Sequence, residues 1–122
     1  MSGWAWAAVA AVGGFGAVVR FLIDGLIGER LATAEFPWGT LAVNLSGSAL
    51  LGALAGAAVR GEVALLAGTA AIGSYTTLST WALESHRLAE DDRLGLAAIN
   101  VFGSLVAGFA SVAAGHAIGR LL

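Results

Sequence analysis

Two uncharged hydrogen-bond donors lie deep inside apolar stretches of this sequence. Asn44 follows five residues after Gly39 in a stretch that begins near Trp38, and Asn100 occupies the matching place in a later stretch. A carboxamide offers two N–H donors and carries no charge. At such depth it suits a passing anion better than a cation. We favour Asn44 as a pore group and leave a structural role open for Asn100.

A run of glycine and hydroxyl-bearing residues interrupts another apolar stretch. Residues 73–80 read Gly-Ser-Tyr-Thr-Thr-Leu-Ser-Thr, and glycine, serine and β-branched threonine all weaken a helix. Non-helical backbone at membrane depth is tolerated only where it is buried in protein or lines a cavity. We therefore expect a helix break whose carbonyls can hold a cation, followed by a half-helix that points its positive end at an anion. The hydroxyls of Thr77, Ser79 and Thr80 would add donors. The alternative is an unbroken helix whose hydroxyls bond back to its own carbonyls.

Charged residues within the apolar stretches are few. Arg20 lies about one turn inside the far end of the first stretch, where it either snorkels to the interface or attracts anions to a vestibule. Glu84 is expected at the end of the third stretch, near water. We expect no carboxylate at mid-membrane depth, which counts against proton-coupled transport.

The sequence offers no convincing catalytic arrangement. There is no cysteine, and His86 and His116 are isolated from each other, so we expect no metal site at either. The run 13–16, Gly-Gly-Phe-Gly, is not a dinucleotide-binding fingerprint and lies within an apolar span. We predict that the protein is not an enzyme.

The elements that must position these residues are membrane helices. Of the 122 residues, 58% are hydrophobic and only 11% are charged, whereas soluble domains are about a quarter charged. Four stretches reach the roughly 20 apolar residues that a bilayer requires; they are 4–23, 38–59, 63–88 and 94–119. We predict an all-α membrane protein with one domain, residues 1–122, surrounded by lipid. The net charge of −2 argues against a nucleic-acid partner.

Arginine gives little guidance to the orientation of these helices. Arg60 and Arg120 fall on the side of the N-terminus, whereas Arg30, Arg87 and Arg93 fall on the other side. Positive residues usually collect on the cytoplasmic side, and this bias is weak. Either the chain inserts in both directions, which permits an antiparallel homodimer, or a small charge difference fixes one orientation.

A short pattern, N-x-x-G-S-x-x-x-G, occurs twice, at residues 44–52 and 100–108. Residues four apart share a helix face. The first copy extends to Gly56 in one stripe, and the second extends to Gly115 in another. Small residues in such stripes let membrane helices approach closely, so the glycines favour packing seams.

The motifs resemble those of the small bacterial fluoride channels, the Fluc or CrcB-type family. The resemblance covers nearly the whole chain, in order. It rests on the run 13–21 that ends in Arg20-Phe21, on Pro37-Trp38-Gly39-Thr40-Leu41-Ala42-Val43-Asn44, on the run 73–81 with Glu84, and on Asn100 with Ser104 and Gly108.

The resemblance implies an antiparallel dual-topology homodimer in the bacterial inner membrane, with two pores that release cytoplasmic fluoride passively. It also implies a structural sodium ion at the dimer centre, held by the backbone carbonyls of Gly73 and Thr76. Asn44 would donate to fluoride, with Ser79, Thr80 and Ser104 along the same path. Arg20 would lie at the aqueous vestibule.

The sequence departs from this family at the paired pore phenylalanines, which fall here at Leu78 and Trp81. Leucine has no ring edge to offer an anion, whereas Trp81 could offer an edge or an N–H. One hypothesis is that the chain pairs with a complementary paralogue. Two further functions compete with the channel: a dual-topology multidrug exporter, which would need an acidic residue within its first helix, and a non-conducting membrane subunit.

Overall fold

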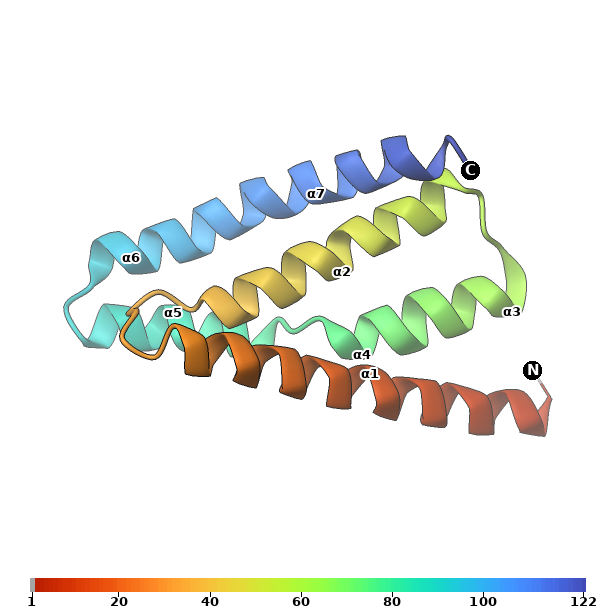
Figure 1. Cartoon of the computed structure of the whole chain (residues 1–122), viewed down its shortest axis with the longest axis horizontal. Coiled ribbons are helices and arrows are strands. Elements are labelled where there is room, and N and C mark those ends of the chain that lie inside the picture. Colours follow the sequence, from red (N-terminus) through yellow and green to blue (C-terminus); the bar gives the residue numbers. More distant parts are fainter. Residues whose placement is uncertain (1) are drawn as a thin grey trace.

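The chain folds into helices that pass back and forth along one long axis. The computed structural model describes residues 2–122, which form helices and short connections. Both termini lie at one end of the molecule, and successive passes run antiparallel (Figure 1). The elements are α1 (Gly3–Arg30), α2 (Trp38–Gly56), α3 (Gly61–Ala64), η1 (Leu65–Ile72), α4 (Gly73–Tyr75), α5 (Ser79–Glu90), α6 (Leu94–Ala98), η2 (Ile99–Gly103) and α7 (Ser104–Gly119).

Within the described residues, three helices are long and apolar enough to cross a membrane. They are Gly3–Arg30, Trp38–Gly56 and the continuous run Leu94–Gly119. The remaining pass, from α3 to α5, is divided by a break, so neither of its halves reaches that length. Several apolar helices therefore make this a multi-pass membrane protein.

Helix boundaries differ from the predictions mainly where polar residues extend a helix beyond its apolar part. The first helix reaches Arg30 rather than residue 23, so the expected loop from Asp24 shortens to residues 31–37. The third pass ends at Glu90, so Glu84 lies in the middle of α5 and not at its end. Neither extension contains a proline, and water satisfies polar side chains as readily on a helix as on a loop. The fourth pass has the predicted bounds, and α2 begins directly after Pro37.

Helices α2 and α7 form the closest seam, and glycines make it possible. A Cβ added at Gly52 would lie 2.2 Å from the carbonyl oxygen of Val112, and one at Gly115 would lie 1.9 Å from that of Ala49. Gly56 and Gly119 extend the same seam by a turn. The expected packing role is therefore confirmed for Gly52, Gly56 and Gly115. It is wrong for Gly108 within this chain, because nothing lies within 4 Å of the Cβ position there.

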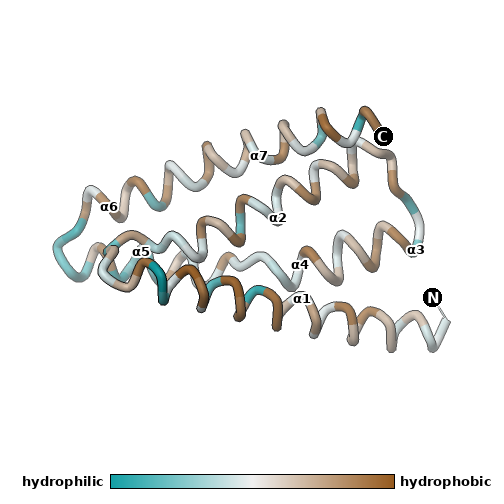
Figure 2. The backbone as a smooth tube through the Cα atoms, in the orientation of Figure 1, coloured by the Kyte–Doolittle hydropathy of each residue, from teal (hydrophilic) through white to brown (hydrophobic). Residues whose placement is uncertain are grey.

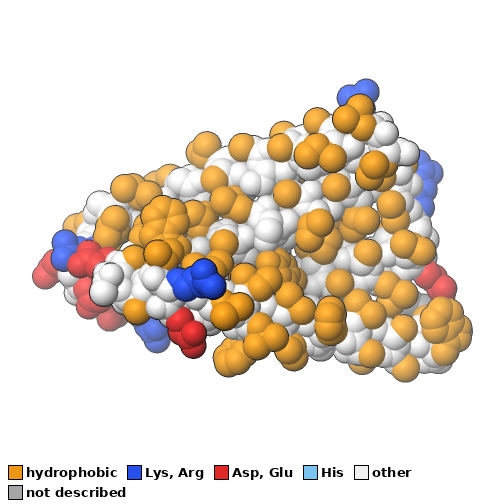
Figure 3. Space-filling view, in the orientation of Figure 1, with side chains coloured by type: hydrophobic (Ala, Val, Ile, Leu, Met, Phe, Trp, Pro, Cys, Tyr) orange, Lys and Arg blue, Asp and Glu red, His pale blue; other side chains and the backbone are white. Residues whose placement is uncertain are grey.

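Polar residues gather at the ends of the molecule and at the break (Figure 2). Most of the face shown in Figure 3 is hydrophobic, and acidic and basic side chains cluster at the end that carries the turns 31–37 and 91–93. Large apolar side chains such as Phe15, Phe21 and Phe109 are each at least 70% exposed. Such exposure is costly in water but natural against lipid.

Candidate functional site

The predicted break in the third pass is present at Thr76–Leu78. Helix α4 ends at Tyr75, and Thr76 takes an extended backbone conformation with φ −79° and ψ 161°. Helical backbone angles resume at Leu78, and α5 begins at Ser79. The alternative of an unbroken helix is therefore wrong, although the Thr76 hydroxyl does bond back to the Ile72 carbonyl at 3.1 Å.

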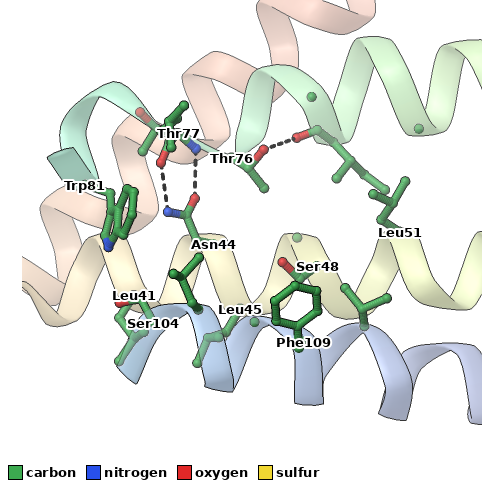
Figure 4. A pocket seen from close by; sticks show the side chains of 18 residues that line it. Leu41, Asn44, Leu45, Ser48, Leu51, Thr76, Thr77, Trp81, Ser104 and Phe109 are labelled. Carbon is green, nitrogen blue, oxygen red and sulfur yellow. Dashed lines mark hydrogen bonds between the residues drawn. The ribbon is translucent and has the colours of Figure 1, made fainter. Parts of the chain in front are cut away.

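The carboxamide of Asn44 holds this break from the neighbouring helix α2. Its Oδ1 accepts the Thr77 backbone N–H at 2.8 Å, and its Nδ2 donates to the Thr77 carbonyl at 2.8 Å (Figure 4). In a continuous helix the Thr77 N–H would donate to the carbonyl of Gly73. Asn44 therefore replaces backbone hydrogen bonds that the break forgoes, which a membrane could not replace with water. One N–H of its amide group remains for another acceptor.

The Thr77 side chain supports the other half of the break. Its Oγ1 accepts the backbone N–H of Thr80 at 3.2 Å and donates to the Thr80 hydroxyl at 3.1 Å. The Ser79 hydroxyl lies 3.5 Å from the same atom. These contacts satisfy a donor in the first turn of α5, which would otherwise lack a partner.

A groove of about 410 Å³ opens beside the break, between α2, α7 and the η1–α4 half-helix (Figure 4). Four predicted pore residues line it: Asn44, Leu78, Trp81 and Ser104. Ser48, Thr76 and Thr77 add polar positions, and the remaining lining consists of aliphatic residues, glycines and Phe109. The groove thus combines a few uncharged donors with apolar walls.

Arg20 and Thr80 lie elsewhere, around a separate pocket of about 200 Å³ that Asp24, Thr40 and Thr77 also line. Thr77 borders both this pocket and the groove. The predicted pore residues therefore line two pockets of this chain that meet at Thr77. They flank the break on two sides, and Ser79 is exposed beyond them.

Arg20 points inward to the break. Its Nη1 donates to the Thr76 carbonyl at 3.4 Å, so the guanidinium is not simply snorkelling. The arginine shares its pocket with Asp24, one helical turn along α1. A vestibule here would carry both signs of charge, which weakens its pull on an anion compared with arginine alone.

Two backbone carbonyls at the break suit a cation. The Gly73 carbonyl lacks its helical donor because the Thr77 N–H is bound to Asn44, and Gly73 is exposed. The Thr76 carbonyl has two lone pairs, and Arg20 uses only one of them, at a long distance. Hard monovalent cations bind such oxygens. The carbonyls that the resemblance assigns to sodium thus have lone pairs that could contribute to a cation site, of which one chain supplies only a part.

Asn100 has a structural role, which its sequence position had left open. It is 1% exposed, its Nδ2 donates to the Ser85 hydroxyl at 2.8 Å, and its Oδ1 accepts from the Ser104 hydroxyl at 3.3 Å. Its backbone carbonyl accepts the indole N–H of Trp81 at 2.9 Å. The expected N–H donor of Trp81 is thus already bound within the chain.

Three polar contacts near the break were not predicted from sequence. Thr40 donates to the carboxylate of Glu84, Ser46 shares a hydrogen bond with Tyr75 at 2.8 Å, and Ser85 bonds Asn100. Polar residues in apolar helices did signal that partners must exist. Their spacing along one helix could not indicate which residues of another helix would meet them.

Comparisons with known proteins cover almost the entire chain. Residues 7–116 match the family model described as CrcB-like protein, Camphor Resistance. A protein named fluoride-specific ion channel FluC 2 from Mycolicibacterium paratuberculosis is 50% identical over 117 residues, which cover 96% of this chain and 95% of the relative.

Two more distant relatives carry similar names. The fluoride-specific ion channel FluC of Agrobacterium fabrum is 43% identical over 121 residues, covering 95% of this chain and 96% of the relative. FluC 1 of Frankia casuarinae is 43% identical over 124 residues, covering 94% and 95%. With a helical membrane fold, a break in its third pass and this coverage, the chain belongs to the CrcB-like family.

Proposed function

We propose that this protein is a fluoride channel that lets fluoride leave the cytoplasm passively. The observation that carries the proposal is the groove beside the break, where Asn44 keeps an N–H donor and carries no charge. The relatives named as fluoride-specific channels support it. The prediction that the protein is not an enzyme forms part of this proposal, because an ion channel is not an enzyme class.

Small anions lose a strong hydration shell when they leave water, so a pore must offer donors in its place. The free N–H of Asn44 and the hydroxyl of Ser48 line the groove, and Ser104 lines it too, with its hydroxyl donating to Asn100 over a long 3.3 Å. The positive end of the α5 helix begins one residue after Leu78, in the same wall. A negative interior potential drives an anion outward with about 2.3 kcal/mol per charge per 100 mV, so passive flow suffices.

A second copy of the chain would complete the site. The groove is open along one side of the single chain, and Gly73 and Gly108 lie on its lining without close neighbours that fill it. We infer a four-helix subunit that inserts in both orientations and forms an antiparallel homodimer in the bacterial inner membrane. The Gly73 and Thr76 carbonyls of each copy would hold a sodium ion, which supplies a fixed charge and links the subunits.

Pairing with a paralogue is the second candidate for the assembly. Leu78 is 73% exposed at the groove and offers no aromatic edge, so a partner with aromatic residues there would complement it. Relatives carry the names FluC 1 and FluC 2, which is consistent with paired copies. Fluoride efflux from liposomes that contain this chain alone would exclude an obligate paralogue.

A multidrug exporter and a non-conducting subunit have less support. A proton-coupled exporter would need a carboxylate within the first apolar stretch, and the first acidic residue of α1 is Asp24. A non-conducting subunit would use the same glycine seam but would have no need of donors in the groove. Conduction separates it from a channel.

The decisive test is efflux of fluoride from proteoliposomes, with chloride as the comparison ion and Asn44→Asp as the variant. The aspartate keeps an acceptor for the Thr77 N–H, but it replaces the amide donor, which also binds the Thr77 carbonyl, with a negative charge. Efflux is therefore compared per unit of folded protein. We expect fluoride efflux to fall at least about 100-fold, since a charge at hydrogen-bond distance opposes an anion by several kcal/mol.

Ser46→Ala is the matched control. It removes a hydroxyl from the same helix, bonded to Tyr75 and outside the groove lining, and should leave efflux within about twofold. Unchanged efflux in Asn44→Asp would remove Asn44 from its assigned role. Absence of fluoride efflux from the wild-type chain, in the presence of a folded protein, would favour a non-conducting subunit or pairing with a paralogue.

A further inference from the structure

The side chain of Trp81 is hydrogen-bonded to the fourth pass through its single polar atom, the indole nitrogen. Its indole Nε1 donates to the carbonyl of Asn100 at 2.9 Å, which joins α5 to η2. Indole nitrogen is a donor only, so this contact uses the full hydrogen-bonding capacity of the side chain. The remainder of the ring lines the groove together with Asn44 (Figure 4).

The Asn100 carbonyl that accepts the indole N–H lies within η2. Residues Ile99–Gly103 form a π-helical turn, in which the hydrogen-bond register widens. The carbonyl still accepts the backbone N–H of Ser104 and has a second lone pair for the indole. Turns of this kind often occur at functional sites.

A closed circuit of hydrogen bonds holds the tryptophan in place. The Ser85 hydroxyl donates to the Trp81 carbonyl at 2.8 Å, and the Asn100 Nδ2 donates to that hydroxyl at 2.8 Å. The indole bond returns to the Asn100 carbonyl. Both ends of Trp81, backbone and ring, are therefore tied to one residue that is 1% exposed.

We propose that Trp81 is a positioning residue that forms a rigid wall of the groove with no free donor. Its N–H does not bind the passing anion; it fixes the ring so that the groove keeps a constant width beside Asn44. The role in anion selectivity rests on the proposed function, whereas the anchoring of the ring does not. Two measurements separate these parts.

The first measurement is the indole ¹⁵N–¹H resonance of Trp81 in detergent micelles, assigned by its loss in Trp81→Phe. Trp38, which is half-exposed at the start of α2, is the internal comparison. We expect the Trp81 N–H to exchange with water at least about 100-fold more slowly than that of Trp38. Its chemical shift should stay constant when sodium fluoride is added. Fast exchange, or a shift that follows fluoride, would overturn the proposal.

The second measurement is the ratio of fluoride to chloride flux through Trp81→Phe, with Trp38→Phe as the matched control. Phenylalanine keeps an aromatic ring but loses the anchor. We expect the ratio to fall about fivefold, which corresponds to a hydrogen bond of about 1 kcal/mol, while the control keeps the wild-type ratio. An unchanged ratio in Trp81→Phe would overturn the role in selectivity. If the wild-type chain passes no fluoride, the proposed function fails and the indole resonance alone decides the anchoring.

Discussion

The two copies of the pattern N-x-x-G-S-x-x-x-G have the same residues at their defining positions but different structural roles. Asn44 sends its side chain to the backbone of the break, whereas Asn100 is buried and binds two serine side chains. Gly52 presses against α7, but Gly108 borders the open groove and has no close neighbour. A repeated pattern therefore identifies equivalent positions on two helices, and the neighbouring helix decides what each position does.

Substituting the matched glycines, Gly52 and Gly108, should give the largest difference in the free energy of unfolding. Gly52→Ala would place a Cβ 2.2 Å from the Val112 carbonyl oxygen, so α2 and α7 must separate. We expect a loss of about 3 kcal/mol in the free energy of unfolding, at the upper end for overpacked sites, measured by unfolding in detergent.

Gly108→Ala is the matched substitution in the second copy, and we expect the monomer to fold with unchanged or slightly higher stability. Equal losses for the two variants would contradict the comparison. A Gly108→Ala protein that folds but fails to dimerise would sharpen it, because a second copy would then occupy the groove.

Substituting the two asparagines should give a difference of intermediate size. Asn100 should matter more for the free energy of unfolding, and Asn44 should matter more for fluoride efflux. Asn100→Ala removes the donor to the Ser85 hydroxyl, which keeps only its bond to the Trp81 carbonyl, and leaves the Ser104 hydroxyl without its acceptor. The loss of both hydrogen bonds at this buried residue should cost about 2–3 kcal/mol of unfolding free energy. Asn44→Ala should cost about 1–2 kcal/mol, since the half-buried break can rearrange towards the groove.

The order should be reversed for fluoride efflux. Per unit of folded protein, Asn44→Ala should lose more of the efflux rate than Asn100→Ala. Thermal unfolding and efflux measured on the same preparations test both statements. Greater destabilisation by Asn44→Ala would show that the break, and not the buried network, is the main polar support of the fold.

The serines should give the smallest difference. Ser104 donates to Asn100 at 3.3 Å, a long hydrogen bond, so Ser104→Ala should cost about 0.5–1 kcal/mol of unfolding free energy. Ser48 lines the groove and makes no hydrogen bond with the described residues, so Ser48→Ala should change stability by less than about 0.5 kcal/mol. Midpoints of unfolding for the two variants provide the check, and identical midpoints would place Ser104 with Ser48 as a groove residue alone.

Much of the fold follows from local physics and was predictable. The cost of polar groups in lipid required long apolar helices, and the fourth pass, Leu94–Gly119, has the predicted bounds. The break was predictable because glycine and hydroxyl residues follow one another at 73–80. The ends of α1 and α5 were not, because apolar character marks the membrane and not the limit of a helix.

The candidate site was only half predictable. Residue type identified Asn44 and the break, but pairing between them depends on the rotation of α2 against the third pass. The division of the pore residues between the groove and the Arg20 pocket depends on the same packing. Trp81 was expected to offer either a ring edge or an N–H, and only its neighbour Asn100 shows that the N–H is taken.

By itself, the sequence determined that this is a helical membrane protein with uncharged donors at depth and a weak point in its third pass. Those properties depend on hydrophobicity and on helix propensity, which each segment carries with it. Only the tertiary structure decided which donors are hydrogen-bonded within the chain and which face the groove. The reason is that hydrogen bonds between helices require distances and directions that no single helix contains.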